Sequence, residues 1–98
     1  MEVVPSPGTL TDRSGTITAG GAAQTLAASN AIRKYLFIQN LHATEALWLN
    51  FTTAAVESQP SISIPAGGSF VMEASFVSTE LVSVIAATTT HPFAAKES

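Results

Sequence analysis

The chain has 98 residues, of which 11% are charged, and it carries a formal net charge of −3. A chain of this length is expected to form one domain around one hydrophobic core. It contains no cysteine and only two histidines, which excludes disulfides and the usual zinc clusters. Four basic residues against seven acidic ones argue against a nucleic-acid partner, because such binding needs several phosphate contacts. We therefore expect no cofactor, no metal and no nucleic acid.

Residues 1–14 differ from the rest of the chain. This segment contains two prolines and lacks a clean alternation of apolar and polar residues, which predicts an extended arm outside the core. A disordered tail is the alternative. If the arm crosses a neighbouring subunit, Val3, Val4 and Leu10 are the side chains that would bury surface there.

The sequence predicts neither export nor membrane insertion. An acidic residue and two prolines stand where a signal peptide has a basic region and an apolar helix. No window approaches the ~20 consecutive apolar residues of a membrane-spanning helix. We therefore expect no membrane partner.

Residues 15–98 form the second unit, a single domain of short strands. Turn residues recur about every ten positions, and apolar and polar residues alternate between them. Gly20 and Gly21 predict a tight turn, residues 65–68 reverse the chain, and the last strand has a frayed end as its alternative. The expected strands are residues 15–19, 22–28, 34–40, 46–51, 61–64, 69–76, 81–87 and 93–97.

A helix is not expected. No stretch of ten residues shows a capped apolar period of 3.6 residues, and residues 55–59 are the one place where a helical turn is considered. About seven or eight short strands without a helix indicate an all-β fold. We predict an antiparallel β-sandwich or a jelly-roll-like barrel.

The sequence contains no catalytic motif: no nucleophile elbow, zinc-protease motif or Gly-rich phosphate loop is present. His42 and His91 lie in predicted loops, and a Ser-His-Asp triad would need Asp12 to reach one of them from the arm. We expect no enzyme and no small-molecule substrate, unless a histidine titrates in a pocket beside a carboxylate. The carboxylates considered for a catalytic pair, none placed by an obvious constraint, are Glu45, Glu57, Glu73 and Glu80.

The stretch YLFIQNLHATEALWLNF, residues 35–51, is apolar on both faces. Leu47 and Leu49 share the expected core face of their strand, which places the intervening tryptophan on the opposite face. Aromatic side chains on a weakly charged surface are typical of interface centres. Two alternatives stay open: the arm or a long loop of the same chain covers the face, or the aromatic rings stack on a carbohydrate. The side chains predicted to form one aromatic patch on the outer sheet face are Tyr35, Phe37 and Trp48.

Four segments carry a resemblance to a known group of proteins. RKYLFIQN, LWLNF, SISIPAGGSF and VSVIAATT follow one another in an order that resembles small proteins of tailed bacteriophages. The similarity covers about residues 14–96 and leaves the arm outside. The positions that the resemblance marks as fold-defining are Arg33, Ile38, Gln39, Asn40, Trp48, Asn50, Phe51, Pro65, Gly67, Gly68 and Phe70.

The resemblance implies a virion component, most specifically a capsid decoration (cement) protein that binds the outer head surface and stabilises contacts between capsid subunits. It implies a homotrimer, the major capsid protein as partner, assembly in the host cytoplasm and no catalytic residue. We expect the aromatic patch to serve subunit or capsid contacts. The alternative from a different class is a carbohydrate- or receptor-binding module, or a connector, in a phage tail or fibre.

Overall fold

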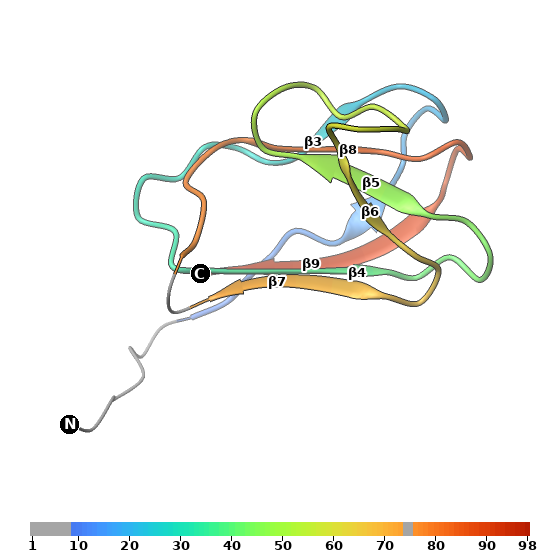
Figure 1. The fold of residues 1–98 in the computed structure, drawn as a ribbon. Coiled ribbons are helices and arrows are strands. Elements are labelled where there is room, and N and C mark those ends of the chain that lie inside the picture. The colour runs from blue at the N-terminus through green and yellow to red at the C-terminus, as the bar shows by residue number, and fades with distance from the viewer. Residues whose placement is uncertain (1–8, 74–75) are drawn as a thin grey trace.

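The computed structural model describes residues 9–73 and 76–98, and these residues form nine strands and no helix (Figure 1). The strands make two antiparallel sheets that lie one above the other with the hydrophobic core between them. The prediction of an all-β, sandwich-like fold is confirmed. The strands are β1 (Thr11–Asp12), β2 (Gly15–Thr16), β3 (Gln24–Ala27), β4 (Tyr35–Asn40), β5 (Leu47–Asn50), β6 (Ile62–Ile64), β7 (Ser69–Glu73), β8 (Val82–Ile85) and β9 (Pro92–Glu97).

Two expectations about helices can be compared with the described residues. Residues 55–59, considered for a helical turn, form coil, bends and a turn. Within the two described ranges there is also no helix of the length and apolar character needed to cross a membrane.

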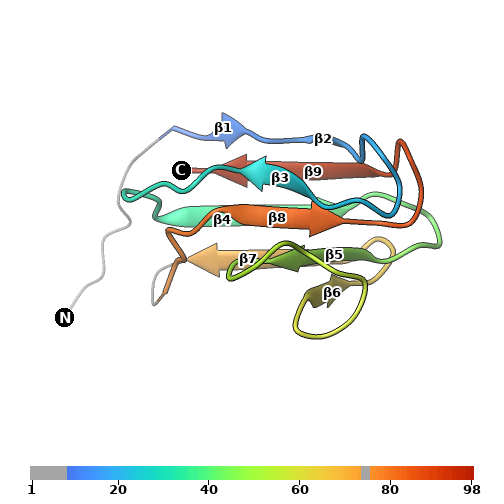
Figure 2. The same cartoon turned by 90° about the horizontal axis from the view of Figure 1, so that it is seen from above.

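The larger sheet has the order β1-β9-β4-β7, with β2 also paired to β9, and the smaller sheet has the order β3-β8-β5-β6 (Figure 2). From β2 to β9, every connection crosses from one sheet to the other except the one between β5 and β6. Strand β9 lies inside the larger sheet and pairs with β1, β2 and β4. The frayed-end alternative for the last strand is therefore wrong.

Residues 35–51 do not form a hairpin, although β4 and β5 follow each other in the chain. Strand β4 belongs to the larger sheet and β5 to the smaller one, and residues 41–46 cross between them. Each strand therefore has its own outer face, and the two outer faces point in opposite directions. This crossing decides where the aromatic residues of the stretch lie.

The core forms where the inner faces of the two sheets meet. Leu36 and Ile38 of β4 and Leu47 and Leu49 of β5 are fully buried, and the alternation in the sequence predicts this for the two leucines of β5. Burying one such side chain contributes about 1.5–3 kcal/mol relative to leaving it exposed. The buried apolar residues of this cluster are Ile17, Leu26, Ala27, Leu36, Ile38, Leu47, Leu49, Ile64, Val82, Val84, Ala86, Phe93 and Ala95.

The structure describes the last part of the expected arm, and this part contains the edge strand β1. Thr11 and Asp12 pair with Lys96 and Glu97 at the margin of the larger sheet, so part of residues 1–14 belongs to the sheet. Leu10 is 61% exposed, whereas Val3 and Val4 lie outside the described residues.

The turn between β2 and β3 confirms the role predicted for the paired glycines. The Ala22 N–H donates to the Ala19 carbonyl, and Gly21 has a φ of +80°, a conformation that favours glycine. Gly20 packs against the connection between β8 and β9: a Cβ there would overlap the Ala87 carbonyl oxygen and lie 2.8 Å from the Thr89 nitrogen.

We predict that Gly20→Ala lowers the free energy of unfolding by roughly 1–3 kcal/mol, because backbone atoms must move to admit the methyl group. Urea unfolding followed by Trp48 fluorescence measures this. Gly15→Ala is the matched control, because its Cβ would meet nothing closer than Phe93 Cζ at 3.6 Å. Equal losses in the two variants would contradict the close packing at Gly20.

Candidate functional site

The three aromatic residues predicted to form one patch lie on two different faces. Tyr35 and Phe37 are on β4, where their neighbours Leu36 and Ile38 point into the core, so both rings lie on the outer face of the larger sheet. Trp48 is on β5, between two buried leucines, and lies on the outer face of the smaller sheet. The prediction of a single patch is wrong, because the chain changes sheet between β4 and β5.

The outer face of the larger sheet is apolar at its centre. In register, Phe37 stands beside Val71 of β7 and Lys96 of β9, and Tyr35 stands beside Glu73. Both aromatic rings are half-buried, and Val71 is 49% exposed. The face therefore offers a short apolar row with a charge on either side.

The outer face of the smaller sheet is partly covered by a loop of the same chain. Asn50 Oδ1 accepts hydrogen bonds from the backbone N–H groups of Thr52 and Thr53, and Ser83 Oγ accepts one from Ala55. These contacts hold residues 51–61 against β5 and β8, and Figure 1 shows this loop on the outer side of the smaller sheet. Trp48, half-buried and in register with Ile85 and Ser63, lies on the same face of β5 as Asn50.

A buried ion pair lies at one end of the molecule. Arg33 Nε stands 2.6 Å from Glu97 Oε1, and the two side chains are 0% and 3% exposed. The Arg33 guanidinium also donates to the carbonyl oxygens of Ala28, Ser78 and Glu80. One side chain thus ties β9 to the connections that precede β4 and β8.

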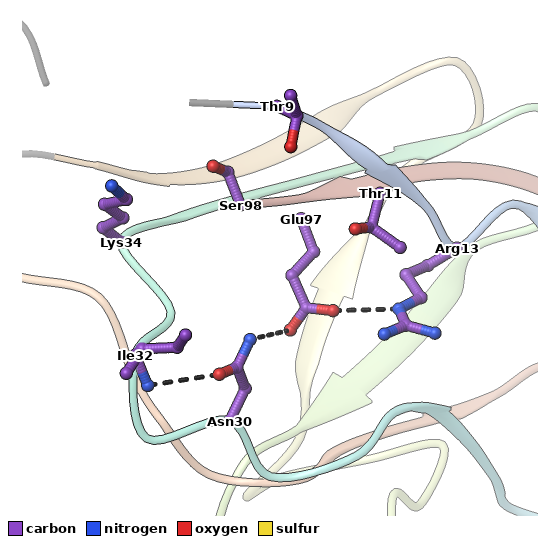
Figure 3. A pocket seen from close by; sticks show the side chains of 8 residues that line it. All are labelled: Thr9, Thr11, Arg13, Asn30, Ile32, Lys34, Glu97 and Ser98. Atoms are coloured by element: carbon purple, nitrogen blue, oxygen red, sulfur yellow. Dashed lines mark hydrogen bonds and ion pairs between the residues drawn. The ribbon is translucent and has the colours of Figure 1, made fainter. Parts of the chain in front are cut away.

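Glu97 completes the cluster with two further donors. Arg13 Nε donates to Oε2 at 2.9 Å, and the Asn30 side-chain amide donates to Oε1 at 3.4 Å (Figure 3). Burial raises the pKa of Glu97, but the hydrogen bonds from Arg33, Arg13 and Asn30 outweigh it and leave the pKa below its usual value. The carboxylate is therefore ionised, and both of its oxygens accept hydrogen bonds from these side chains.

An open pocket of about 320 Å³ borders this cluster (Figure 3). Arg13 and Lys34 give it positive charge, and the Glu97 carboxylate between them offsets part of it. The lining residues are Thr9, Thr11, Arg13, Asn30, Ile32, Lys34, Glu97 and Ser98.

The opposite end of the molecule holds a second polar cluster, built around both histidines. The His91 side chain is fully buried, its Nδ1 stands 2.9 Å from Glu45 Oε1, and its Nε2 stands 2.7 Å from Asn40 Oδ1. The Asn40 amide nitrogen donates to the carbonyl oxygens of Glu45 and Ile64, which fixes the direction of Oδ1. The His42 ring stacks on the His91 ring with centroids 4.7 Å apart.

The pKa of Glu45 falls to about 2 because Thr88 and His91 donate hydrogen bonds to the carboxylate. The Glu45 carboxylate faces His91 Nδ1 and Asn40 Oδ1 faces Nε2, so both ring nitrogens are engaged by side chains of the same chain. Neither nitrogen is open to a substrate. A histidine beside a carboxylate would favour an enzyme, and His91 has this neighbour. It lacks, however, the open nitrogen that a general base needs.

His42, Glu45 and His91 are residue types that bind zinc, and their ligand atoms lie within 4.8 Å of one another. The geometry does not suit an ion. His42 Nδ1 accepts from the N–H groups of Thr44 and Glu45, and both His91 nitrogens face oxygens. The stacked rings are only 24° from parallel, so their nitrogen lone pairs do not converge on one point. The contacts of this cluster therefore hold strand ends and connections together and do not form a metal site.

The remaining acidic candidates stay apart. Asp12 pairs with Lys96 at 2.9 Å on the sheet margin, and hydrogen bonds from Ser14 and Lys96 hold its pKa below its usual range. The triad imagined with a histidine is therefore not formed. The other carboxylates considered for a catalytic pair, Glu57, Glu73 and Glu80, are exposed, and the structure brings no two of them together among its described ion pairs and hydrogen bonds.

The sequence did not lead us to expect Glu97 and Asn40 as buried side chains. Glu97 pairs with Arg33, and Asn40 pairs with His91. A signal was present: on the inner face of β4, Asn40 follows two buried apolar residues, and on β9 Glu97 follows Phe93 and Ala95. A polar residue in phase with core positions at a strand end predicts a buried polar partner.

No family model, curated protein or solved structure matches this chain.

We predict that Glu97→Gln lowers the free energy of unfolding by roughly 3–5 kcal/mol, because the buried Arg33 charge keeps its carbonyl acceptors but loses its counter-charge. Chemical denaturation at neutral pH measures the loss. Asp12→Asn removes a carboxylate from an exposed, solvent-screened pair of the same sheet and should cost far less. Similar costs for both variants would show that the buried pair is not the stabilising contact.

We predict that acidification destabilises the protein through Glu45. A carboxylate whose folded pKa is depressed stabilises the fold fully above its ordinary pKa of 4.5 and loses that contribution as pH falls toward about 2. Denaturation midpoints between these limits should fall, and Glu45→Gln should make the fall shallower. Thr88→Val keeps the charge but removes a hydrogen bond, so it should also reduce the slope. A slope unchanged in both variants would contradict the assignment.

Proposed function

We propose that this chain is a non-enzymatic structural protein of a phage virion, a capsid decoration protein that binds the outer head surface. The observation that carries the proposal is the strand pairing: β2 with β9, β3 with β8, β4 with β7 and β5 with β6. A long hairpin rolled into two sheets produces this nested order. It supports a jelly roll, an architecture used by viral capsid and lectin domains.

The polar clusters support a structural rather than a catalytic role. In the described part of the chain, no buried side-chain nitrogen or oxygen lacks a hydrogen-bond partner. Arg33, Glu97, Asn40 and His91 hold the connections at the two ends of the sheets. Side chains that bind one another in this way stabilise the fold of a shell component, and they leave few polar groups for catalysis.

The surface supports a role in assembly. Only 11% of residues are charged, against roughly 25% in an ordinary globular domain. We propose that Tyr35 and Phe37 on one outer face and Trp48 on the other serve different contacts, one with further copies in a trimer and one with the major capsid protein. Many weak contacts, multiplied by symmetry, would then produce firm attachment.

We also propose that the part of residues 1–14 that precedes β1 acts as an arm toward a neighbouring subunit. The 61% exposure of Leu10 supports this, because an apolar side chain beyond the sheet margin is free to pack elsewhere. Val3 and Val4 would add to the same contact.

The second candidate function is carbohydrate or receptor binding at a phage tail or fibre. The half-buried Trp48 ring, in register with the polar Ser63, favours it, because an aromatic ring beside hydroxyl groups suits a sugar. A glycan array with no binding by the full chain would count strongly against this candidate.

We predict that antibody to this chain labels phage heads in lysates of the source culture. Immunogold particles in negative stain should lie over icosahedral heads, because a decoration protein is displayed on the outer surface. Labelling confined to tails or fibre tips would favour the second candidate. The control uses the same antibody absorbed with purified protein, and the absence of labelling on intact and opened particles would overturn the virion proposal.

A further inference from the structure

Strand β7 is the one long, unguarded edge among the described strands. Exposed edges invite pairing with another chain, and proteins usually guard them with short strands, bulges, charged residues or proline. The margin at β1 and β2 is broken into two dipeptide strands, β3 carries a bulge, and β6 has three residues. β7 has five residues in unbroken register with β4, and none of them is lysine or proline.

The hydrogen-bond pattern shows which backbone groups of β7 face outward. Tyr35 of β4 exchanges both bonds with Ser98 on the β9 side. Because directions alternate along a strand, Leu36 and Ile38 bond to β7, where they stand opposite Met72 and Phe70. The backbone groups of the intervening residues then point away from the sheet.

Those intervening residues are Ser69, Val71 and Glu73, and all three are exposed. No hydrogen bond recorded between described residues engages their N–H or C=O groups from the open side. Figure 2 shows β7 at the margin of the larger sheet opposite β1 and β2. The edge is therefore available to another strand.

We propose that β7 pairs with β7 of a second copy of this chain in antiparallel orientation about a two-fold axis at Val71. The two larger sheets would then join into one continuous sheet. This contact lies outside the outer faces considered above, and it does not depend on the virion role.

The sequence of β7 is self-complementary in this register. Val71 meets Val71 of the second copy, and Ser69 meets Glu73, the only charged residue of the strand. No like charges stand opposite each other, which favours the pairing. Each of these residue pairs can exchange both N–H···O bonds, because their backbone groups face the open edge.

The two faces of the new junction also fit. On the inner side, Phe70 would stand opposite Met72 of the second copy, and both are partly buried side chains packed against the core. On the outer side, the paired Val71 side chains would extend the apolar row that contains Phe37. A two-fold contact of this kind uses the same patch on both copies and closes on itself.

Charge substitutions at Ser69 test both the contact and its register. Ser69→Glu would oppose Glu73 of the second copy twice in each dimer, whereas Ser69→Lys would attract it twice. In sedimentation velocity over a wide concentration range, the dimer dissociation constant should rise about five-fold in the first variant and fall about five-fold in the second. Ser29→Glu and Ser29→Lys, at an exposed position between β3 and β4, carry the same changes in net charge and should leave it unchanged.

Amide hydrogen exchange on the wild-type full chain gives the second readout. The N–H groups of Ser69, Val71 and Glu73 should become protected as concentration rises, while those of Phe70 and Met72 are protected throughout. A chain that stays monomeric at millimolar concentration, or charge effects of the same sign in both Ser69 variants, would overturn the proposal. Protection of all five amides in the dilute monomer would overturn it as well, because the edge would then be covered within one chain.

Discussion

The ion pair between Arg33 and Glu97 is the contact on which the arrangement of the sheets depends. It joins the approach to β4 with the end of β9, and the same guanidinium holds carbonyl oxygens of two connections that cross between the sheets. At the other end of the β4–β9 pair, Asn40 and His91 make the matching polar contact. The two central strands of the larger sheet are thus fixed at both ends, and the apolar core fills the space between.

Charges buried in this way are costly to desolvate, and well-packed apolar side chains often stabilise a core as much. A guanidinium, however, can donate to several oxygens at fixed angles, which an aliphatic side chain cannot do. Arg33 satisfies carbonyl oxygens of crossing loops that would otherwise be buried without donors. Its contribution therefore lies in holding particular loops in place, while the hydrophobic core supplies most of the free energy.

Because the buried polar groups bind one another, the groups that can contact other molecules lie on the surface. The buried polar groups are engaged with one another, while the half-buried aromatic rings, the apolar Val71 and the open backbone of β7 remain accessible. A chain with few charges can place such features close to neighbouring copies without strong repulsion. The proposed contacts with other copies would use these accessible groups.

The sequence by itself determined strands β2 to β9 and the turn at Gly20 and Gly21, because alternation and turn chemistry are local properties, but it assigned β1 to an arm outside the core. Leu47 and Leu49 were identified as core residues on that basis, whereas β4 is apolar on both faces and alternation could not choose between them. Only the tertiary structure decided that β4 and β5 belong to different sheets, which separates Trp48 from Tyr35 and Phe37. It also decided that Glu97 meets Arg33 and that His91 meets Asn40. These contacts join residues 64 and 51 positions apart, and strand periodicity carries no information about which distant strand lies alongside.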